Sequence, residues 1–207
     1  MKIVPASYEI LTPLDGAAIL KHIERCGRVC YKSEHKVTPD SAPLFVASII
    51  KRGHESVLEH YSFSVLFTVD RGVSHEIVRH RLASYSQEST RYCNYSNDRF
   101  DKSITIIMPN YLEPGTEGFD HWLGSCVWAE EKYFNMLEWG CTPQEARAVL
   151  PNSLKTEVVM TANLREWRHF LRLRTSKAAH PQMREVTIPL LKELKNTIPV
   201  VFDDIEI

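Results

Sequence analysis

Apolar residues recur at helical spacing in several parts of the chain. After an acidic start they follow this spacing through residues 15–28, which are therefore predicted to form a helix. A second helix is predicted for residues 41–51, and Gly53 ends it. Further helices are predicted for the later part of residues 115–140, for a short stretch capped by Thr142 that stops before Pro151, and for residues 154–175 and 182–197.

Other stretches have the pattern of β-strands. Residues 61–69 alternate apolar and polar positions at first and are rich in β-branched and aromatic side chains, so they are predicted to form a strand. Residues 104–108 are predicted to form a shorter strand, and residues 1–11 to contain one edge strand. Strands and helices do not alternate as they do in a doubly wound parallel sheet. The pattern therefore predicts a mainly helical α+β domain with a few strands.

In the middle of the chain a predicted helix is followed by a polar segment. Ser74 is predicted to cap a helix that runs through Ile77 and Val78 into the basic residues 79–81. Residues 84–100 are polar, aromatic and rich in turn-forming residues, and they are predicted to form a loop.

Composition and charge restrict the class of protein. The chain has 207 residues, 43% of them hydrophobic and 25% charged, which is typical of one globular domain. Its formal net charge is −1, and the absence of an overall positive charge argues against general nucleic-acid binding. Five cysteines without a disulfide framework are typical of free thiols in a reducing cytosol. With no signal segment and no apolar run of spanning length, a cytoplasmic protein that does not bind a membrane is predicted.

A local basic cluster is the clearest functional signal. Arg79, His80 and Arg81 stand together, and Ser89 and Arg91 follow after a short polar stretch. Isolated buried charge is costly, so this composition does not suit a hydrophobic core. The cluster predicts a binding surface for a ligand that is anionic, flat and rich in hydrogen-bonding groups, such as a nucleotide.

The predicted helix at 154–175 allows two interpretations. Asn163, Trp167, Phe170 and Arg174 are spaced to share one helical face. In one interpretation Arg174 extends into solvent at the helix end while the two aromatic residues pack. In the other, the Arg174 guanidinium enters a cleft beside the basic cluster and pairs with an anion.

Several familiar motifs are absent or have the wrong spacing. His75 and His80 are five residues apart, which places them on different helical faces, and the histidines at 54 and 60 do not match a zinc-peptidase motif. No metal site is therefore predicted. Neither glycine-rich phosphate-binding motif is present, so a nucleotide would be held by arginines, hydroxyls and helix ends. Ser89 is interpreted as a hydrogen-bond donor rather than a nucleophile, since no base–acid pair is placed to activate it.

Four separated motifs carry a resemblance to a known family. Arg79-His80-Arg81 followed after seven residues by Ser89 resembles the signature of the flavin-dependent thymidylate synthases, also called thymidylate synthase complementing proteins. The segment 53–60 is similar to the one that precedes the first long strand in that family. The segment 147–151 and the run from 163 to 174 are similar to an arginine-bearing helix end and to the last catalytic helix. The resemblance covers about residues 20–200.

The resemblance implies a fold, an activity and its co-reactants. It implies a single mainly helical domain over residues 1–207 with a small antiparallel sheet, and a homotetramer with active sites at subunit interfaces. It implies the reductive methylation of dUMP to dTMP, in which methylenetetrahydrofolate gives the one-carbon unit and FAD, reduced by NADPH, gives the hydride. No covalent enzyme nucleophile is implied, which agrees with the absence of a cysteine in a comparable basic, hydroxyl-rich setting, Cys93 excepted.

The resemblance also implies site residues. Arg174 is the implied catalytic residue, beside the uracil, where its charge would favour the ionised N3 form of the ring. The implied FAD-binding residues are Ser56, Arg79, His80, Arg81, Gln87, Asn163, Arg165 and His169. The implied dUMP-binding residues are Glu76, Arg79, Gln87, Glu88, Ser89, Thr90, Arg91, Arg147 and Arg174.

Two other hypotheses use the same residues. A single-stranded nucleic-acid module would stack bases on Tyr85, Tyr92, Tyr95 and Phe100 beside neighbouring arginines, and it would bind oligonucleotides in a salt-sensitive way. A structural protein would use the arginines for ion pairs between subunits. Neither hypothesis accounts for all four motifs.

Overall fold

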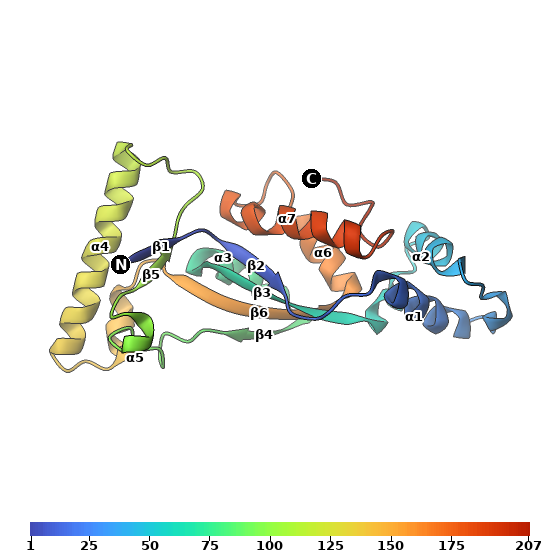
Figure 1. The fold of residues 1–207 in the computed structure, drawn as a ribbon, viewed down its shortest axis with the longest axis horizontal. Helices are drawn as coiled ribbons and strands as arrows, with labels where there is room; N and C mark the ends of the chain where they lie inside the picture. The colour runs from blue at the N-terminus through green and yellow to red at the C-terminus, as the bar shows by residue number, and fades with distance from the viewer. The chain divides into compact units, whose positions relative to one another are not determined.

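The computed structural model describes all of residues 1–207, and its elements mix helices with strands (Figure 1). Helices dominate, and the longest is α4. The strands are β1 (Lys2–Val4), β2 (Ser7–Ile10), β3 (Ser62–Asp70), β4 (Ala83–Gln87), β5 (Thr105–Ile107) and β6 (Lys155–Asn163). The α-helices are α1 (Gly16–Val29), α2 (Ser41–Lys51), α3 (Arg71–Ile77), α4 (Glu117–Glu138), α5 (Pro143–Ala146), α6 (Leu164–Arg174) and α7 (Pro181–Thr197). Short 3₁₀ helices are η1 (Glu34–Lys36), η2 (Glu55–His60), η3 (Asp98–Phe100) and η4 (Arg147–Val149).

The strands form two small sheets. The larger has four strands in the order β2-β3-β6-β4, and the smaller pairs β1 with β5 in parallel. Just beyond the ends of β3 and β6, the Leu164 amide donates to the Tyr61 carbonyl, and the Arg71 amide donates to the Asn152 carbonyl. Residue 61 is thus bonded to residue 164 and residue 71 to residue 152, so the two strands run in opposite directions and β3 and β6 are antiparallel. The α+β class predicted from the sequence is confirmed, and the parallel β1–β5 pair adds to the antiparallel pairing that was expected.

The chain folds into two compact units, each made of three separate segments. Unit 1 consists of Met1–Ser7, Phe67–Arg79 and Ser86–Val159, and unit 2 consists of Tyr8–Leu66, His80–Tyr85 and Met160–Ile207. Strands β3 and β6 each begin in one unit and end in the other. None of the helices is long and apolar enough to span a bilayer.

The core of unit 2 fixes helix α6 against strand β3. Trp167 is fully buried, its ring stacks on that of Phe63 with centroids 4.8 Å apart, and its indole N–H donates to the Phe63 carbonyl at 3.2 Å. The stacking and hydrogen bond satisfy both the apolar body and the polar N–H of a large side chain. Phe170 packs edge-on against Trp167. The two aromatic residues of the predicted helical face therefore belong to the core.

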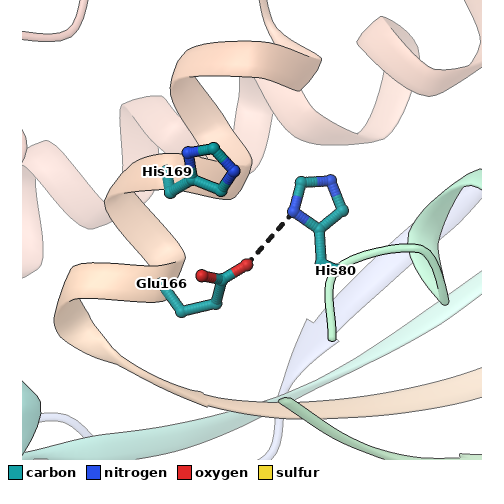
Figure 2. A group of neighbouring side chains, drawn as sticks. All are labelled: His80, Glu166 and His169. Atoms are coloured by element: carbon teal, nitrogen blue, oxygen red, sulfur yellow. Dashed lines mark hydrogen bonds and ion pairs between the residues drawn. The ribbon is translucent and has the colours of Figure 1, made fainter. Parts of the chain in front are cut away.

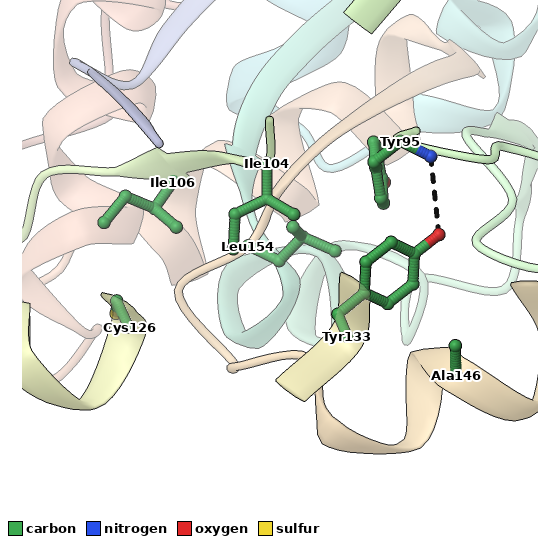
Figure 3. Close-up of a cluster of buried hydrophobic side chains, with 7 residues drawn as sticks. All are labelled: Tyr95, Ile104, Ile106, Cys126, Tyr133, Ala146 and Leu154. Atoms are coloured by element: carbon green, nitrogen blue, oxygen red, sulfur yellow. Dashed lines mark hydrogen bonds between the residues drawn. The ribbon is translucent and has the colours of Figure 1, made fainter. Parts of the chain in front are cut away.

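Unit 1 has its own core, which joins α4, β5 and the segment after β4 (Figure 3). Tyr133 lies at its centre, fully buried, with its hydroxyl 3.4 Å from the Tyr95 amide that donates to it. Ile104, Ile106 and Leu154 belong to the same cluster, with Ile104 beside Leu154. The residues of this core are Tyr95, Ile104, Ile106, Cys126, Tyr133, Ala146 and Leu154.

Most predicted elements are confirmed, but the prediction of one helix over 154–175 is wrong. Residues Lys155–Asn163 form β6, in which buried and more exposed positions alternate as in a strand covered on one face. The helix begins only at Leu164, where the Asn163 side chain accepts a hydrogen bond from the Glu166 amide at 2.9 Å and caps it. Asn163 therefore does not share a helical face with Arg174.

Three local predictions around the basic cluster also need correction. Asp70 rather than Ser74 caps α3, because its carboxylate accepts from the Val73 amide at 2.6 Å. The Ser74 hydroxyl donates to the Arg71 carbonyl inside the helix, and the helix ends at Ile77, before the basic residues. Part of the predicted loop is strand β4, and residues 1–11 contain two short strands rather than one.

Candidate functional site

The residues predicted to form the site divide between the two units. Most of those expected to bind the nucleotide substrate lie in unit 1, and most of those expected to bind the flavin lie in unit 2. Unit 1 holds Glu76, Arg79, Gln87, Glu88, Ser89, Thr90, Arg91 and Arg147, and unit 2 holds Ser56, His80, Arg81, Asn163, Arg165, His169 and Arg174.

Unit 1 contains a small cation-lined cavity, named here the anion pocket. Its volume is about 280 Å³, and its lining includes the side chains of Arg71, His75, Thr90, Arg147 and Asn152. Thr90 is buried, and its hydroxyl accepts a long hydrogen bond of 3.5 Å from the Arg147 guanidinium. Two guanidiniums, an imidazole and neutral hydrogen-bonding groups around a small cavity form a donor set suited to a phosphate. Arg71 and His75 were not predicted from the sequence to belong to this site.

Gln87 is held in one orientation. Its amide nitrogen donates to the Ser74 hydroxyl at 2.9 Å and to the Thr156 hydroxyl at 3.3 Å. Both amide hydrogens therefore point into unit 1, so the amide oxygen is the group that Gln87 can present to a ligand.

Glu88 serves the fold of unit 1. One carboxylate oxygen lies 3.0 Å from the Lys155 ammonium in a salt bridge, and the other accepts from the Tyr95 hydroxyl at 3.2 Å. Burial, reinforced by the Glu88 charge, raises the pKa of Tyr95, which keeps this phenol in its donating form. Glu88 therefore ties the segment after β4 to the core and to β6.

The segment after Glu88 is a tight turn that begins at Ser89. The Ser89 carbonyl accepts from the amides of Tyr92 and Cys93, and the Ser89 hydroxyl accepts from the Arg91 amide at 3.3 Å. The Arg91 guanidinium is exposed and lies over the Tyr92 ring, 5.4 Å from its centroid. The turn therefore presents a hydroxyl and a guanidinium from adjacent positions.

Unit 2 contains a buried polar group centred on His80, named here the His80 cluster (Figure 2). His80 Nδ1 lies 3.2 Å from Glu166 Oε1, and the Arg174 Nε–H donates to His80 Nε2 at 3.1 Å. His169 lies one turn along α6 from Glu166, with its ring centroid 5.6 Å from that of His80. His80 and Glu166 are each only 6% exposed, so this contact is shielded from water.

Burial, modified by nearby charges, shifts the pKa values of two titratable groups in the His80 cluster. Burial raises the pKa of Glu166, and the nearby His169 and Arg165 oppose that rise. The Tyr85 hydroxyl donates to the His80 carbonyl at 2.6 Å, and burial together with the Glu166 charge raises the pKa of Tyr85 to about 12. Glu166 and Tyr85 were not predicted as site residues, although clusters of perturbed groups are typical of functional sites.

The remaining predicted side chains of unit 2 lie near its surface. Arg165 forms an exposed ion pair with Glu59 at 2.6 Å, of a kind that contributes little to stability. Arg81 is exposed and makes no hydrogen bond or ion pair with its side chain, which leaves that cation for a ligand. Arg79, in unit 1, is exposed in the same way.

Ser56 lines a second cavity of unit 2, between α1, α2 and η2, with a volume of about 930 Å³. The lining includes the cationic side chains of Arg28 and Arg52, together with His54 and the aromatic Phe45. A cavity of this size is in the range of cofactor sites. Arg28 is ion-paired with Glu24 and lies over the Phe45 ring, so Arg52, His54 and the Ser56 hydroxyl are the groups that could meet the phosphates of a flavin dinucleotide. Of the residues predicted to bind the flavin, Ser56 is the one that lines this cavity.

Comparison with known proteins identifies relatives over almost the whole chain. The family model described as "Thymidylate synthase complementing protein" matches residues 17–200. The flavin-dependent thymidylate synthase of Mycolicibacterium vanbaalenii is 38% identical over 210 residues, which cover 95% of this chain and 82% of that protein. The enzyme of the same name from Mycolicibacterium gilvum is 35% identical over 221 residues, covering 98% and 85%. That from Geobacter sulfurreducens is 31% identical over 201 residues, covering 90% and 85%.

A solved structure shares the fold. The UMP/dUMP methylase PolB from Streptomyces cacaoi, solved with 5-Br UMP bound, superimposes with a TM-score of 0.78. The match covers 98% of this chain and 95% of that one at 19% sequence identity. At this level of identity the likeness concerns the fold.

Proposed function

Because the chain belongs to the thymidylate synthase complementing protein family, we propose that it catalyses the reductive methylation of dUMP to dTMP. The one-carbon donor is methylenetetrahydrofolate, and the reductant is FAD, which NADPH reduces. The relatives named above are flavin-dependent thymidylate synthases, and the structural neighbour is a UMP/dUMP methylase. The proposal also includes a homotetramer with active sites at its subunit interfaces, in line with the sequence resemblance.

The observation that carries the proposal is the anion pocket. The dianionic phosphate of dUMP needs charge-assisted donors, and Arg147 with the buried Thr90 offers them beside Arg71 and His75. Ser89 and Arg91 add a hydroxyl and a guanidinium from the neighbouring turn. The Gln87 amide oxygen is suited to accept from a sugar hydroxyl or a ring N–H. With Glu76, Arg79, Glu88 and Arg174, these residues form the proposed dUMP site.

The flavin is proposed to be held mainly by unit 2. Ser56 lines the large cavity there, and the exposed Arg81 offers an uncompensated cation for the diphosphate. When bound, the flavin supplies the hydride that completes the methyl group. The full proposed set is Ser56, Arg79, His80, Arg81, Gln87, Asn163, Arg165 and His169.

Arg174 is proposed to activate the pyrimidine ring. A guanidinium beside uracil favours the ionised N3 form, and the electron-rich ring is then nucleophilic at C5. This chemistry needs no covalent enzyme adduct. It agrees with the state of Cys93, the one cysteine near the basic cluster, because burial raises the pKa of its thiol and the Glu88 charge adds to the rise. A raised pKa lowers the fraction of thiolate, which is the nucleophilic form.

The proposal is tested by spectroscopy and by product analysis on the purified protein. We expect flavin absorption bands that NADPH bleaches without oxygen, and dTMP when dUMP and methylenetetrahydrofolate are added. A colourless protein that does not take up added FAD would contradict the flavin assignment. Flavin binding without dTMP formation would restrict the proposal to the cofactor.

A further inference from the structure

The hydrogen bonds of His80 fix which ring nitrogen carries the proton. The Nε atom of an arginine bears a hydrogen and has no acceptor capacity. Since Arg174 Nε donates to His80 Nε2 at 3.1 Å, Nε2 must be the unprotonated nitrogen of the neutral ring. The hydrogen is then on Nδ1, which lies 3.2 Å from Glu166 Oε1 and donates to it.

The surroundings restrain the ring in this orientation. Phe170 packs against the His80 ring edge-on with centroids 4.9 Å apart, and the Tyr85 hydroxyl holds the His80 backbone carbonyl. Glu166 is itself placed at the first turn of α6, where Asn163 caps its amide and the helix dipole favours a carboxylate. Carboxylate, imidazole and guanidinium thus form a chain of hydrogen bonds from α6 through His80 to Arg174.

We propose that Glu166 is a positioning residue, which fixes the Nδ1–H tautomer of His80 so that Nε2 accepts from Arg174 and orients its guanidinium. The inference rests on the proposed function only in the role it gives to Arg174 at the pyrimidine ring. A carboxylate that sets the tautomer of a histidine is a common device for orienting a second polar group.

A metal site is the competing interpretation of the same side chains. His80, Glu166 and His169 offer ligand atoms that all lie within 4.8 Å of one another, and two histidines with a carboxylate suit zinc or iron. The bond from Arg174 argues against it, because the ring's unprotonated nitrogen is already an acceptor and Nδ1 carries the hydrogen. The guanidinium would also repel a cation bound nearby.

The charged groups facing His80 come from two elements besides its own segment. Helix α6 contributes Glu166, His169 and Arg174, with Arg165 close enough to affect Glu166, and β4 contributes Tyr85. Glu166 is the anionic member of this set that contacts the ring. Removing its carboxylate therefore removes the acceptor that selects Nδ1–H.

The first measurement is the histidine tautomer, read from ¹⁵N chemical shifts in the full-length, flavin-loaded protein labelled on its histidines. His80→Asn identifies the signals of His80. We expect Nδ1–H in the unmodified protein and in Glu166→Gln, whose amide oxygen still accepts. We expect Glu166→Leu to populate the Nε2–H tautomer as well, because Nδ1–H then has no acceptor, and this tautomer cannot accept the hydrogen bond from Arg174 Nε. A wild-type protein with Nε2–H, or a Leu variant that shows Nδ1–H alone, would overturn the proposal.

The second measurement is turnover of dUMP by the same variants. Glu166→Leu should lower kcat about tenfold with a smaller change in the KM for dUMP, and Glu166→Gln should retain kcat within about twofold. Glu193→Gln is the matched control. The Glu193 carboxylate is exposed, accepts a hydrogen bond from the Tyr8 hydroxyl and does not belong to the His80 cluster. If both Glu166 variants lose kcat equally while the Gln variant keeps Nδ1–H, the positioning role is wrong.

The two proposals fail in different ways. A wild-type protein that makes no dTMP but shows the Nδ1–H tautomer contradicts the proposed function and supports the hydrogen-bond chain. Normal turnover in Glu166→Leu contradicts the positioning role and supports the proposed function. Tight zinc binding that Glu166→Gln and His169→Gln both abolish would overturn the positioning role in favour of a metal site.

Discussion

The anion pocket of unit 1 and the His80 cluster of unit 2 use cationic side chains in opposite ways. In the anion pocket, Arg147 is exposed and makes one long hydrogen bond, so its charge is uncompensated and accessible to a ligand. In the His80 cluster, Arg174 is half-buried and donates to a histidine that is itself held by a carboxylate. From this difference we expect the anion pocket to contribute binding energy and the His80 cluster to contribute orientation.

The comparison predicts that Arg174→Ala has the largest effect. Removing a preorganised cation at a developing charge typically lowers kcat about 10²–10³-fold. Bound flavin should remain, because the flavin is proposed to bind to other residues. The measurements are kcat for dTMP formation and the flavin-to-protein ratio from absorbance. Turnover at the wild-type rate would show that Arg174 is not the ring-activating group.

Arg147→Ala should act on binding instead. Loss of a charge-assisted hydrogen bond of about 1.5–3 kcal/mol corresponds to a rise of roughly 10- to 100-fold in the KM for dUMP, with kcat changed much less. Steady-state kinetics at several dUMP concentrations check this. Lys132→Ala is a matched control, because this cation of unit 1 lies over the Trp128 ring on α4 and does not line the pocket. If Arg147→Ala lowered kcat as much as Arg174→Ala does, the proposed difference between the anion pocket and the His80 cluster would be wrong.

Ser89→Ala should give a smaller change of the same kind. A neutral hydroxyl contributes about 0.5–1.5 kcal/mol, so dUMP binding should weaken about two- to tenfold while the chemical rate stays nearly constant. Equilibrium binding and single-turnover rates separate the two quantities. Complete inactivity with dUMP still tightly bound would instead assign a nucleophilic role to Ser89.

A further prediction concerns the stability of unit 2 rather than its activity, and it rests on an ion pair. The fully buried Arg168 donates to Asp204 at 2.7 and 2.8 Å, and this hydrogen bonding lowers the pKa of Asp204. A lowered folded pKa stabilises the protein above the ordinary aspartate pKa of about 3.9, and the contribution is lost as the pH falls through the folded value. The free energy of unfolding, measured with urea at a series of acidic pH values, should therefore decrease less steeply with falling pH in Asp204→Asn than in the unmodified protein. An identical pH profile in both proteins would show that Asp204 has no such linkage.

The sequence predicted the helices that have strong boundary signals. Residues 15–28 and 41–51 have clear helical periodicity, and the elements formed, α1 and α2, agree with those limits. The prediction over 154–175 missed the start of α6, because β6 passes into the helix without a proline or glycine between them. The pattern Asn163-x-x-Glu166 marks a helix start, and it would have placed the boundary correctly.

The candidate site was predictable only in part. The basic triplet and Ser89 lie close together in the sequence, so their composition alone indicates a binding surface. The contact of His80 with Glu166 joins residues 86 positions apart, and no local pattern reports it. Likewise, Arg71 and His75 join the anion pocket only because β6 brings the segment around Asn152 to the start of α3.

The discontinuity of the two units has a consequence for how the protein is made. Unit 2 needs Tyr8–Leu66 early in the chain and Met160–Ile207 late in it, with most of unit 1 between them. Closing so long a loop costs entropy that local contacts cannot offset, and such topologies fold slowly. A growing chain on the ribosome therefore keeps the face of β3 that Trp167 covers exposed until α6 emerges. During synthesis this interval, rather than the finished fold, is when the chain is most exposed to aggregation.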